Sequence, residues 1–310
     1  MNKLDYSHHE FVMRVGATLL CTLVLTICIR SFLKKTDDRV DKYASDLKPL
    51  NVGIVGAGAV GTFAGIRMLE SPLINNVVLI GRESLMKALE RNDNIITVKD
   101  NTKGGQKKDF LVGEKFNVIC DGSLESLRSC DVIILSVKSN VTEDVGESIA
   151  EVLPPTSSAS ILSFQNGIRN PERLRVVFAS NHPNVNVVAS VVAFASEWEA
   201  GGTTFALNFP GGCILEKPRE SRQAQQKNAI IVKALSNGGL KSKQTTRIES
   251  IMYAKLLINL INPVNALSGV TVPKMFAQRG YRLVLAAAIK EAVAAVKSSG
   301  IEAGKSLPVR

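Results

Sequence analysis

A glycine-rich turn between a β-prone run and a helical run constrains this chain more than any other part of its sequence. Residues 51–55 read NVGIV, residues 56–61 read GAGAVG, and residues 62–70 are expected to form a helix. In this arrangement the first glycine allows a tight turn, the second lets a diphosphate approach the backbone, and the third lets the helix pack closely on the strand. The phosphates then lie on unpaired N–H groups at the helix N-terminus. The segment predicts a dinucleotide site formed by Gly56, Ala57, Gly58, Ala59, Val60 and Gly61, with a chance glycine turn as the alternative.

The second β-prone run ends in an arginine. Residues 76–80 read NVVLI and are followed by Gly81 and Arg82. Proteins that bind NAD place an acidic residue about 20 residues beyond the fingerprint, where it binds the ribose 2′-hydroxyl. A guanidinium at that position can instead donate two hydrogen bonds to a 2′-phosphate. Arg82 therefore favours NADP(H), although Glu83 adjoins it and a solvated turn residue is the alternative.

Strand-like and helix-like runs then alternate along the chain. Strands are expected at 117–120, 131–137, 160–164 and 185–194, a helix at 143–153, and a turn with antiparallel β structure at 201–217. This alternation predicts an α/β fold with a doubly wound parallel sheet. Such a sheet binds ligands at the carboxyl ends of its strands, where Lys138 and Asn166 fall.

The last part of the sequence is helical and mostly apolar. A helix is expected over 248–261, followed by Asn262 and Pro263. Lys255, Asn259 and Asn262 are four and three residues apart, so the prediction places them on one helical face. A lysine that faces a crevice can donate a proton to a carbonyl oxygen while a hydride reaches the carbon. The alternative is a solvent-facing lysine with asparagines that cap the helix before Pro263.

These motifs together resemble those of the ketopantoate reductases (2-dehydropantoate 2-reductases). The resemblance runs from about residue 51 to the C-terminus, and its matching pieces are GAGAVG at 56–61, Arg82, VKS at 137–139, FQNG at 164–167 and KLLINLINP at 255–263. It implies a Rossmann-type N-terminal domain, an all-helical C-terminal domain, and NADPH-dependent reduction of ketopantoate, a small 2-keto acid, to pantoate on the route to pantothenate and coenzyme A.

The resemblance also implies roles for individual residues. Lys255 would be the general acid on the keto oxygen, and Asn259 would hold hydroxyl and carboxylate groups of the substrate. Lys138 and Asn166 would line the nicotinamide and substrate pocket, and Arg82 would bind the 2′-phosphate. The family has three residues between its two helix asparagines and this chain has two. Asn262 would therefore take the role of the second asparagine from a position one residue earlier in the helix.

The expected organisation is an anchor-like segment and tether at 1–50, an NADP-binding Rossmann domain at 51–243 and a helical substrate domain at 244–310. The family's next helices would lie beyond Arg310, so a shortened helical domain is expected, with apolar surface that is exposed or covered by a partner subunit, such as the second copy in a homodimer.

The first 50 residues contain an uncharged, mostly apolar run. It spans residues 15–29 between Arg14 and Arg30 and extends to residue 33. Basic residues are more frequent after the run than before it, which predicts a membrane anchor at 15–33 with residues 34–310 on the cytoplasmic side. Because a bilayer needs about 20 residues, a buried or frayed N-terminal helix is the alternative.

Composition narrows the function further. The net charge of +10 comes from 38 Lys and Arg against 28 Asp and Glu, interspersed and with few aromatic residues, so we expect an anionic small ligand and no nucleic acid. Five cysteines without a C-x-x-C pair and three histidines predict a reducing compartment and no metal site.

Two functions from other classes stay open at this stage. One is a non-catalytic NADP-binding protein at a membrane, and the other is a reductase of a different small 2-keto acid, of the hydroxyacid-dehydrogenase type. Arg82 disfavours an NAD-only member of the second class.

Overall fold

The computed structural model describes residues 48–113, 116–119, 124–199, 201–218 and 222–301. Over the described residues, the chain divides into two compact units, one up to residue 248 and one from residue 249 onward. Each unit is described by itself.

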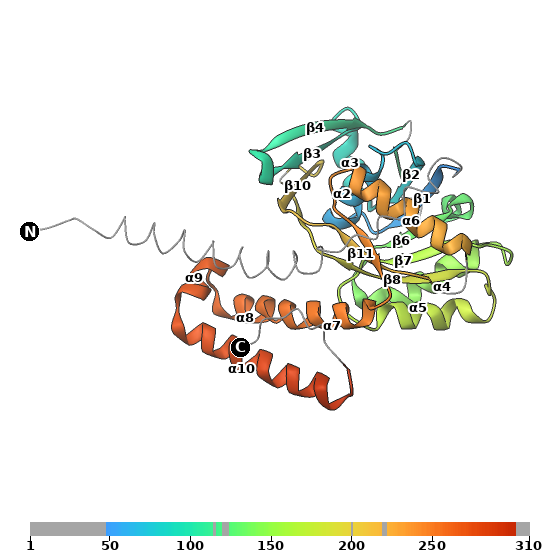
Figure 1. Ribbon diagram of the computed structural model, residues 1–310. Helices are drawn as coiled ribbons and strands as arrows, with labels where there is room; N and C mark the ends of the chain where they lie inside the picture. Colours follow the sequence, from blue (N-terminus) through green and yellow to red (C-terminus); the bar gives the residue numbers. More distant parts are fainter. Residues whose placement is uncertain (1–47, 114–115, 120–123, 200, 219–221, 302–310) are drawn as a thin grey trace, which may run out of the picture. The chain divides into compact units, whose positions relative to one another are not determined.

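The first unit is built on an eight-stranded sheet in the order β12-β11-β8-β7-β6-β1-β2-β5 (Figure 1). Every neighbouring pair from β5 to β8 is parallel, whereas β11 is antiparallel to β8 and parallel to β12. This confirms the predicted doubly wound α/β fold. The strands are β1 (Leu50–Val55), β2 (Ile74–Ile80), β5 (Phe116–Ile119), β6 (Val132–Leu135), β7 (Ser160–Ser163), β8 (Asn186–Val192), β11 (Cys213–Glu216) and β12 (Lys243–Thr245).

The central strands are apolar on both faces because helices cover both sides of the sheet. In β6, Val132 and Ile134 join one core cluster, while Ile133 and Leu135 join the other. The first cluster takes in side chains of α2 and α6, and the second takes in side chains of α4 and α5. These helices are α2 (Ala59–Met68), α4 (Thr142–Val152), α5 (Asn170–Ala179) and α6 (Arg222–Asn237), and the short 3₁₀ turns η3 (Glu125–Ser129) and η4 (Ser139–Val141) lie before and after β6.

A smaller four-stranded sheet packs on the same side as α2, in the order β4-β3-β10-β9. Its members are β3 (Ile95–Asp100), β4 (Gln106–Leu111), β9 (Ala195–Trp198) and β10 (Thr204–Phe209); α3 (Glu83–Glu90) precedes β3, and η2 (Asn101–Lys103) joins β3 to β4. The sequence predicted antiparallel structure at 201–217, and β10 does pair antiparallel with β9, but it also pairs parallel with β3. The partner β3 lies about a hundred residues earlier in the chain, so no local pattern could indicate this pairing.

The helical unit consists, over its described residues, of α7 (Ile248–Asn259, whose first residue belongs to the other unit), α8 (Ile261–Ser268), α9 (Val272–Ala277) and α10 (Arg279–Ser298). The prediction of a single helix over 248–261 is wrong at its end, because α7 ends at Asn259. Pro263 has no N–H to donate to the Asn259 carbonyl four residues before it, and its ring crowds that carbonyl. The backbone instead forms a tighter turn at Leu260, whose N–H donates to the Leu257 carbonyl three residues earlier at 3.3 Å. The next helix, α8, then begins at Ile261.

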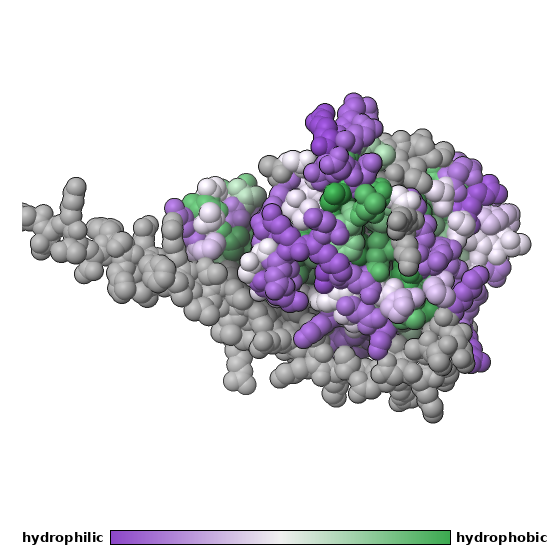
Figure 2. Space-filling view, turned by 90° about the horizontal axis from the view of Figure 1, so that it is seen from above, coloured by the Kyte–Doolittle hydropathy of each residue, from purple (hydrophilic) through white to green (hydrophobic). Residues whose placement is uncertain are grey.

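Residues 15–33, which the sequence predicts to be a membrane anchor, lie outside the described residues. Among the helices that the structure describes, none has both the length and the apolar character needed to cross a bilayer. Seen from above the view of Figure 1, hydrophilic side chains cover much of the described surface and surround a smaller apolar area (Figure 2).

Two cysteines fall within the described residues, Cys130 and Cys213, and both are buried in the core. Burial and the neighbouring carboxylate of Asp131 raise the pKa of Cys130 to about 12, so this thiol stays protonated and unreactive near neutral pH. The described residues also contain no group of three His, Cys, Asp or Glu side chains that could hold a metal ion.

Candidate functional site

The strand order places a reversal point between β1 and β6. From β1 the chain adds β2 and β5 on one side of the sheet and then returns to add β6, β7 and β8 on the other. This is the 3-2-1-4-5-6 order of a Rossmann domain, in which a ligand binds beyond the carboxyl ends of the two strands at the reversal. The glycine turn follows β1 at this point, and Ser136 follows β6.

The glycine turn is held tightly against the end of β6. Gly56 has φ of +109°, which favours glycine, and a Cβ there would lie 2.9 Å from the backbone of Ser136. Ser136 Oγ donates a hydrogen bond to the Gly56 carbonyl at 2.7 Å. A Cβ at Gly61 would overlap Ser136 Oγ and lie 2.7 Å from the Gly56 carbonyl oxygen. Two of the three glycines are therefore required by packing alone.

Gly58 differs from the other two glycines because it faces open space. A Cβ built there meets no atom within 4 Å, and the residue is exposed and extended, with φ of −80° and ψ of 174°. It is the N-cap of α2, where no side chain accepts a hydrogen bond from the first helical N–H groups, and the first turn has no acidic residue. Ala59, Val60 and Gly61 supply those N–H groups. This terminus can accept an anion, since the helix dipole and the free donors both favour negative charge.

Arg82 lies where the sequence predicts, directly beyond β2 and at the N-cap of α3. Its side chain is exposed and forms no ion pair with another described residue. Glu83, which adjoins it, is instead paired with Lys87 across one helical turn, Nζ to Oε1 at 2.6 Å. The neighbouring carboxylate is thus partly neutralised, and the guanidinium can turn toward an anion beyond β2.

Lys138 and Asn166 lie in the loops that follow β6 and β7, and both are exposed. The sequence did not indicate how these loops are held together. Buried polar side chains connect them: Gln165 donates a hydrogen bond to Thr142 Oγ1, and Asn170 donates one to Ser139 Oγ. Gln165, like Ser136, stands just beyond a strand end and close to a predicted site residue, and that proximity is the signal that could have found these two residues. The structure thus brings the glycine turn, Arg82, Lys138 and Asn166 to the carboxyl ends of four adjacent strands.

The remaining predicted site residues belong to the helical unit. Lys255 and Asn259 lie one turn apart in α7, and both side chains are partly buried. Asn262 lies in α8, beyond the break at Leu260, and is exposed. The expectation that all three share one face of a single helix is corrected to a pair on α7 and a third residue on the next helix.

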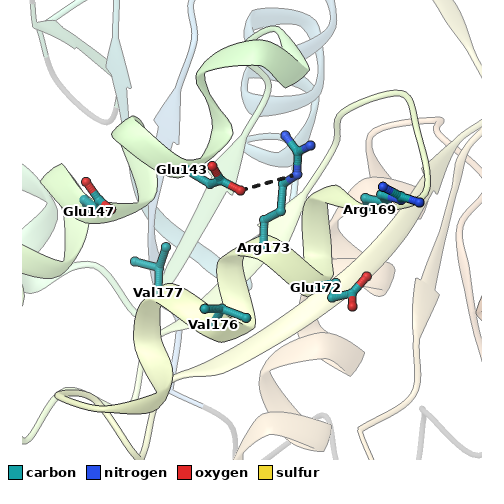
Figure 3. A pocket seen from close by; sticks show the side chains of 7 residues that line it. All are labelled: Glu143, Glu147, Arg169, Glu172, Arg173, Val176 and Val177. Carbon is teal, nitrogen blue, oxygen red and sulfur yellow. Dashed lines mark ion pairs between the residues drawn. The ribbon is translucent and has the colours of Figure 1, made fainter.

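A separate hollow of about 460 Å³ lies between α4 and α5 (Figure 3). Arg173 points from α5 toward Glu143 of α4, with Nε 3.4 Å from Oε1, and Glu147 and Glu172 also line the hollow. Three carboxylates against two guanidiniums make it a poor site for a dinucleotide that carries several phosphate charges. We therefore assign the candidate site to the strand ends and not to this hollow.

Comparisons with known proteins agree with this geometry. The family model for the N-terminal part of ketopantoate reductase PanE/ApbA matches residues 52–219, which is more than half of the chain, and the C-terminal model of the same family matches residues 247–307. A search of curated proteins found no significant match.

Several solved structures share the fold. A PanE/ApbA family ketopantoate reductase from Ralstonia eutropha JMP134 is 22% identical, with a TM-score of 0.66 over 81% of this chain and 76% of that chain. A 2-dehydropantoate 2-reductase from Porphyromonas gingivalis W83 is 16% identical, with a TM-score of 0.62 over 84% and 86%. A D-mandelate dehydrogenase solved in complex with NADH is 20% identical, with a TM-score of 0.62 over 82% and 75%.

The predicted resemblance is thereby confirmed by two family models that match in chain order, by the strand order of the sheet and by the glycine turn at its reversal point. The chain belongs to the ketopantoate reductase family.

Proposed function

We propose that this chain is an NADPH-dependent reductase of a small 2-keto acid, and that the acid is ketopantoate. The observation that carries the proposal is the open position at Gly58, in a turn whose other two glycines are held by packing. Nothing in the packing of the described residues requires glycine there, so its lack of a side chain is explained by a ligand that approaches the backbone. Family membership adds the reaction class, since the family is named for a reductase.

The described residues fit a reduced dinucleotide. The diphosphate would accept hydrogen bonds from the N–H groups at the start of α2, the 2′-phosphate would bind Arg82, and Lys138 and Asn166 would hold the nicotinamide end. When bound, the coenzyme supplies a hydride. The chain's own contribution at these strand ends is to orient the ring and to balance the negative charge of the phosphates.

The helical unit is proposed to carry the proton transfer. Lys255 would donate a proton to the keto oxygen as negative charge develops on it, which lowers the barrier by general acid catalysis. Asn259, one turn further along α7, would bind hydroxyl and carboxylate groups of the substrate, with Asn262 as a further contact. We keep residues 51–243 as the cofactor domain and 244–310 as the substrate domain.

The direct test of the proposal is an assay with the purified full-length chain. NADPH oxidation should depend on ketopantoate and should show saturation in both reactants. The control is a panel of small 2-keto acids without the hydroxyl group of ketopantoate. Turnover with another panel member but not with ketopantoate would support the proposed reductase activity and overturn the proposed substrate. NADPH binding with no turnover on any acid would indicate a binding protein.

The position of Asn262 favours one alternative substrate class. In α8 it is exposed and separated from the Lys255–Asn259 pair by the break at Leu260. A site with one substrate-binding asparagine would suit a 2-keto acid with fewer polar groups than ketopantoate.

The anchor at 15–33, the cytoplasmic orientation and a homodimer stay predictions. For the homodimer, a ketopantoate reductase from Staphylococcus aureus with 20% identity and a TM-score of 0.57 is described as dimeric.

Replacement of Arg82 should remove the preference for NADPH over NADH. Arg82→Ala removes a guanidinium that would form charge-assisted hydrogen bonds with the 2′-phosphate, so the Kd for NADPH should rise roughly 10- to 100-fold. The Kd for NADH should change little, because NADH has no 2′-phosphate. Titrations of both coenzymes measure this. Arg91→Ala, an exposed arginine at the other end of α3, is the control and should alter neither value. An Arg82→Ala protein that still prefers NADPH would refute the assignment.

A further inference from the structure

Three buried polar side chains lie beneath the loops that carry Lys138 and Asn166. Thr142 is the first residue of α4, Gln165 lies two residues beyond β7, and Asn170 is the first residue of α5. Their exposed fractions are 0%, 8% and 3%. Buried polar groups of this kind are stable only when their hydrogen bonds are satisfied, so the bonds that they form show what they hold in place.

Thr142 and Gln165 connect the two loops from below. Gln165 Nε2 donates to Thr142 Oγ1 at 2.7 Å, and Thr142 Oγ1 donates to the carbonyl of Ser139 at 3.0 Å. Gln165 is fixed at its other end by Ser163 of β7, whose Oγ donates to Oε1 at 3.0 Å. The hydroxyl of Thr142 is therefore the link between the end of β7 and the backbone that follows Lys138.

Asn170 and Ser139 complete the connection at the peptide of Asn166. Asn170 Nδ2 donates to the Asn166 carbonyl at 2.8 Å and to Ser139 Oγ at 3.1 Å, and Ser139 Oγ donates to the same carbonyl at 2.8 Å. Two donors on one carbonyl fix the orientation of the peptide between Asn166 and Gly167. Lys138 directly precedes Ser139, so both predicted cofactor residues are attached to the same hydrogen-bonded group.

This network fixes the positions of the two loops and adds no contact with the ligand. Lys138 and Asn166 are exposed and would each lose conformational freedom on binding a ligand. Loops whose backbone is already fixed lose less, so the fixed arrangement raises affinity without touching the ligand. Networks of satisfied buried hydrogen bonds also strengthen one another in the low-dielectric interior.

We propose that Thr142 is a positioning residue for coenzyme binding: through Gln165 and the Ser139 carbonyl it holds the loops of Lys138 and Asn166 in the arrangement that binds the nicotinamide half of NADPH. This inference rests on the proposed function. It assigns to Thr142 no contact with coenzyme or substrate.

Substitution at Thr142 separates the role of the hydroxyl from that of the side-chain volume. Thr142→Val keeps the shape but cannot accept from Gln165 or donate to Ser139, so the Kd for NADPH should rise about tenfold, equivalent to about 1.4 kcal/mol. Thr142→Ser restores the hydroxyl and should bind NADPH within about twofold of the parent. The Kd is measured by calorimetric titration of each full-length protein, together with its Tm.

His182→Leu is the matched control for a purely structural effect. His182 is buried just beyond α5, and its Nε2 lies 2.9 Å from the Ala150 carbonyl of α4, so it joins the same two helices at their far ends. This variant should lower the Tm and leave the Kd unchanged. If Thr142→Val lowers the Tm but binds NADPH as the parent does, the positioning role is refuted and the proposed function stands. If neither the parent nor His182→Leu binds NADPH, the proposed function fails, and the positioning role fails with it.

Discussion

Gly58→Asp is expected to weaken NADPH binding severely and at the same time to leave the fold as stable as before, or slightly more stable. The new side chain enters open space, since a Cβ at this position meets no atom within 4 Å and the backbone is extended. Aspartate is a favoured N-cap and its charge complements the helix dipole, so the free energy of unfolding should rise by a few tenths to about 1 kcal/mol.

The same substitution removes the proposed anion site in two ways. The carboxylate accepts the N–H groups at the start of α2 and repels the diphosphate that would otherwise bind them. We expect the Kd for NADPH to rise by on the order of a hundredfold or more, because each lost hydrogen bond to a charged phosphate costs about 1.5–3 kcal/mol and about 1.4 kcal/mol is tenfold in affinity. Calorimetric titration and thermal unfolding measure the two effects.

Gly61→Val provides the contrast within the same turn. Its Cβ would overlap Ser136 Oγ and press on the Gly56 carbonyl, so this variant should lower the Tm as well as the affinity. If Gly58→Asp binds NADPH as tightly as the parent, the diphosphate does not lie at this turn. If it unfolds as readily as Gly61→Val, Gly58 serves packing and not binding.

Lys255→Ala is expected to have the largest effect on turnover. Loss of a general acid typically lowers kcat by about 10²- to 10⁴-fold, because the developing oxyanion must take its proton from water. Coenzyme affinity should stay within about twofold, since the proposed coenzyme residues all precede the helical unit. Ketopantoate-dependent NADPH oxidation and a separate NADPH titration distinguish these effects.

Lys274→Ala serves as the control for the lysine substitution. Lys274 is an exposed lysine of α9 in the same unit, and its loss should leave kcat unchanged. Lys255→Ala that retains full kcat would exclude Lys255 as the proton donor. A loss of NADPH binding in this variant would instead place the lysine at the coenzyme.

The parts of the fold that the sequence predicted are those with local signals. The glycine turn is found in the sequence because three glycines at fixed spacing follow a β-prone run, and packing requires two of them, Gly56 and Gly61. The central strands of the main sheet are found because burial on both faces makes their apolar runs continuous, as in β6, whereas the edge strand β12, with the sequence KQT, was not predicted. The break in the last apolar helix also had a local signal, since Pro263 cannot donate to Asn259, but the apolar run around it suggested continuity.

The parts that could not be predicted depend on contacts between distant residues. Ser136 bonds to the carbonyl of Gly56, 80 residues earlier, and Thr142 bonds to Gln165, 23 residues later. The pairing of β10 with β3 likewise joins segments that no periodicity relates. The sequence thus predicted the strand ends to within one or two residues, as for β6, which ends at Leu135 and not at residue 137, while only the folded chain shows which side chains hold those ends together.

The central claim is that the turn opening at Gly56 binds the diphosphate of NADPH, and a calorimetric titration of the purified full-length protein tests it most directly. We predict saturable heat with NADPH at one site per chain, weaker binding of NADH, and no detectable heat with NADPH for Gly58→Asp. Absence of heat with the parent protein, or equal heat from the parent and Gly58→Asp, would contradict the claim.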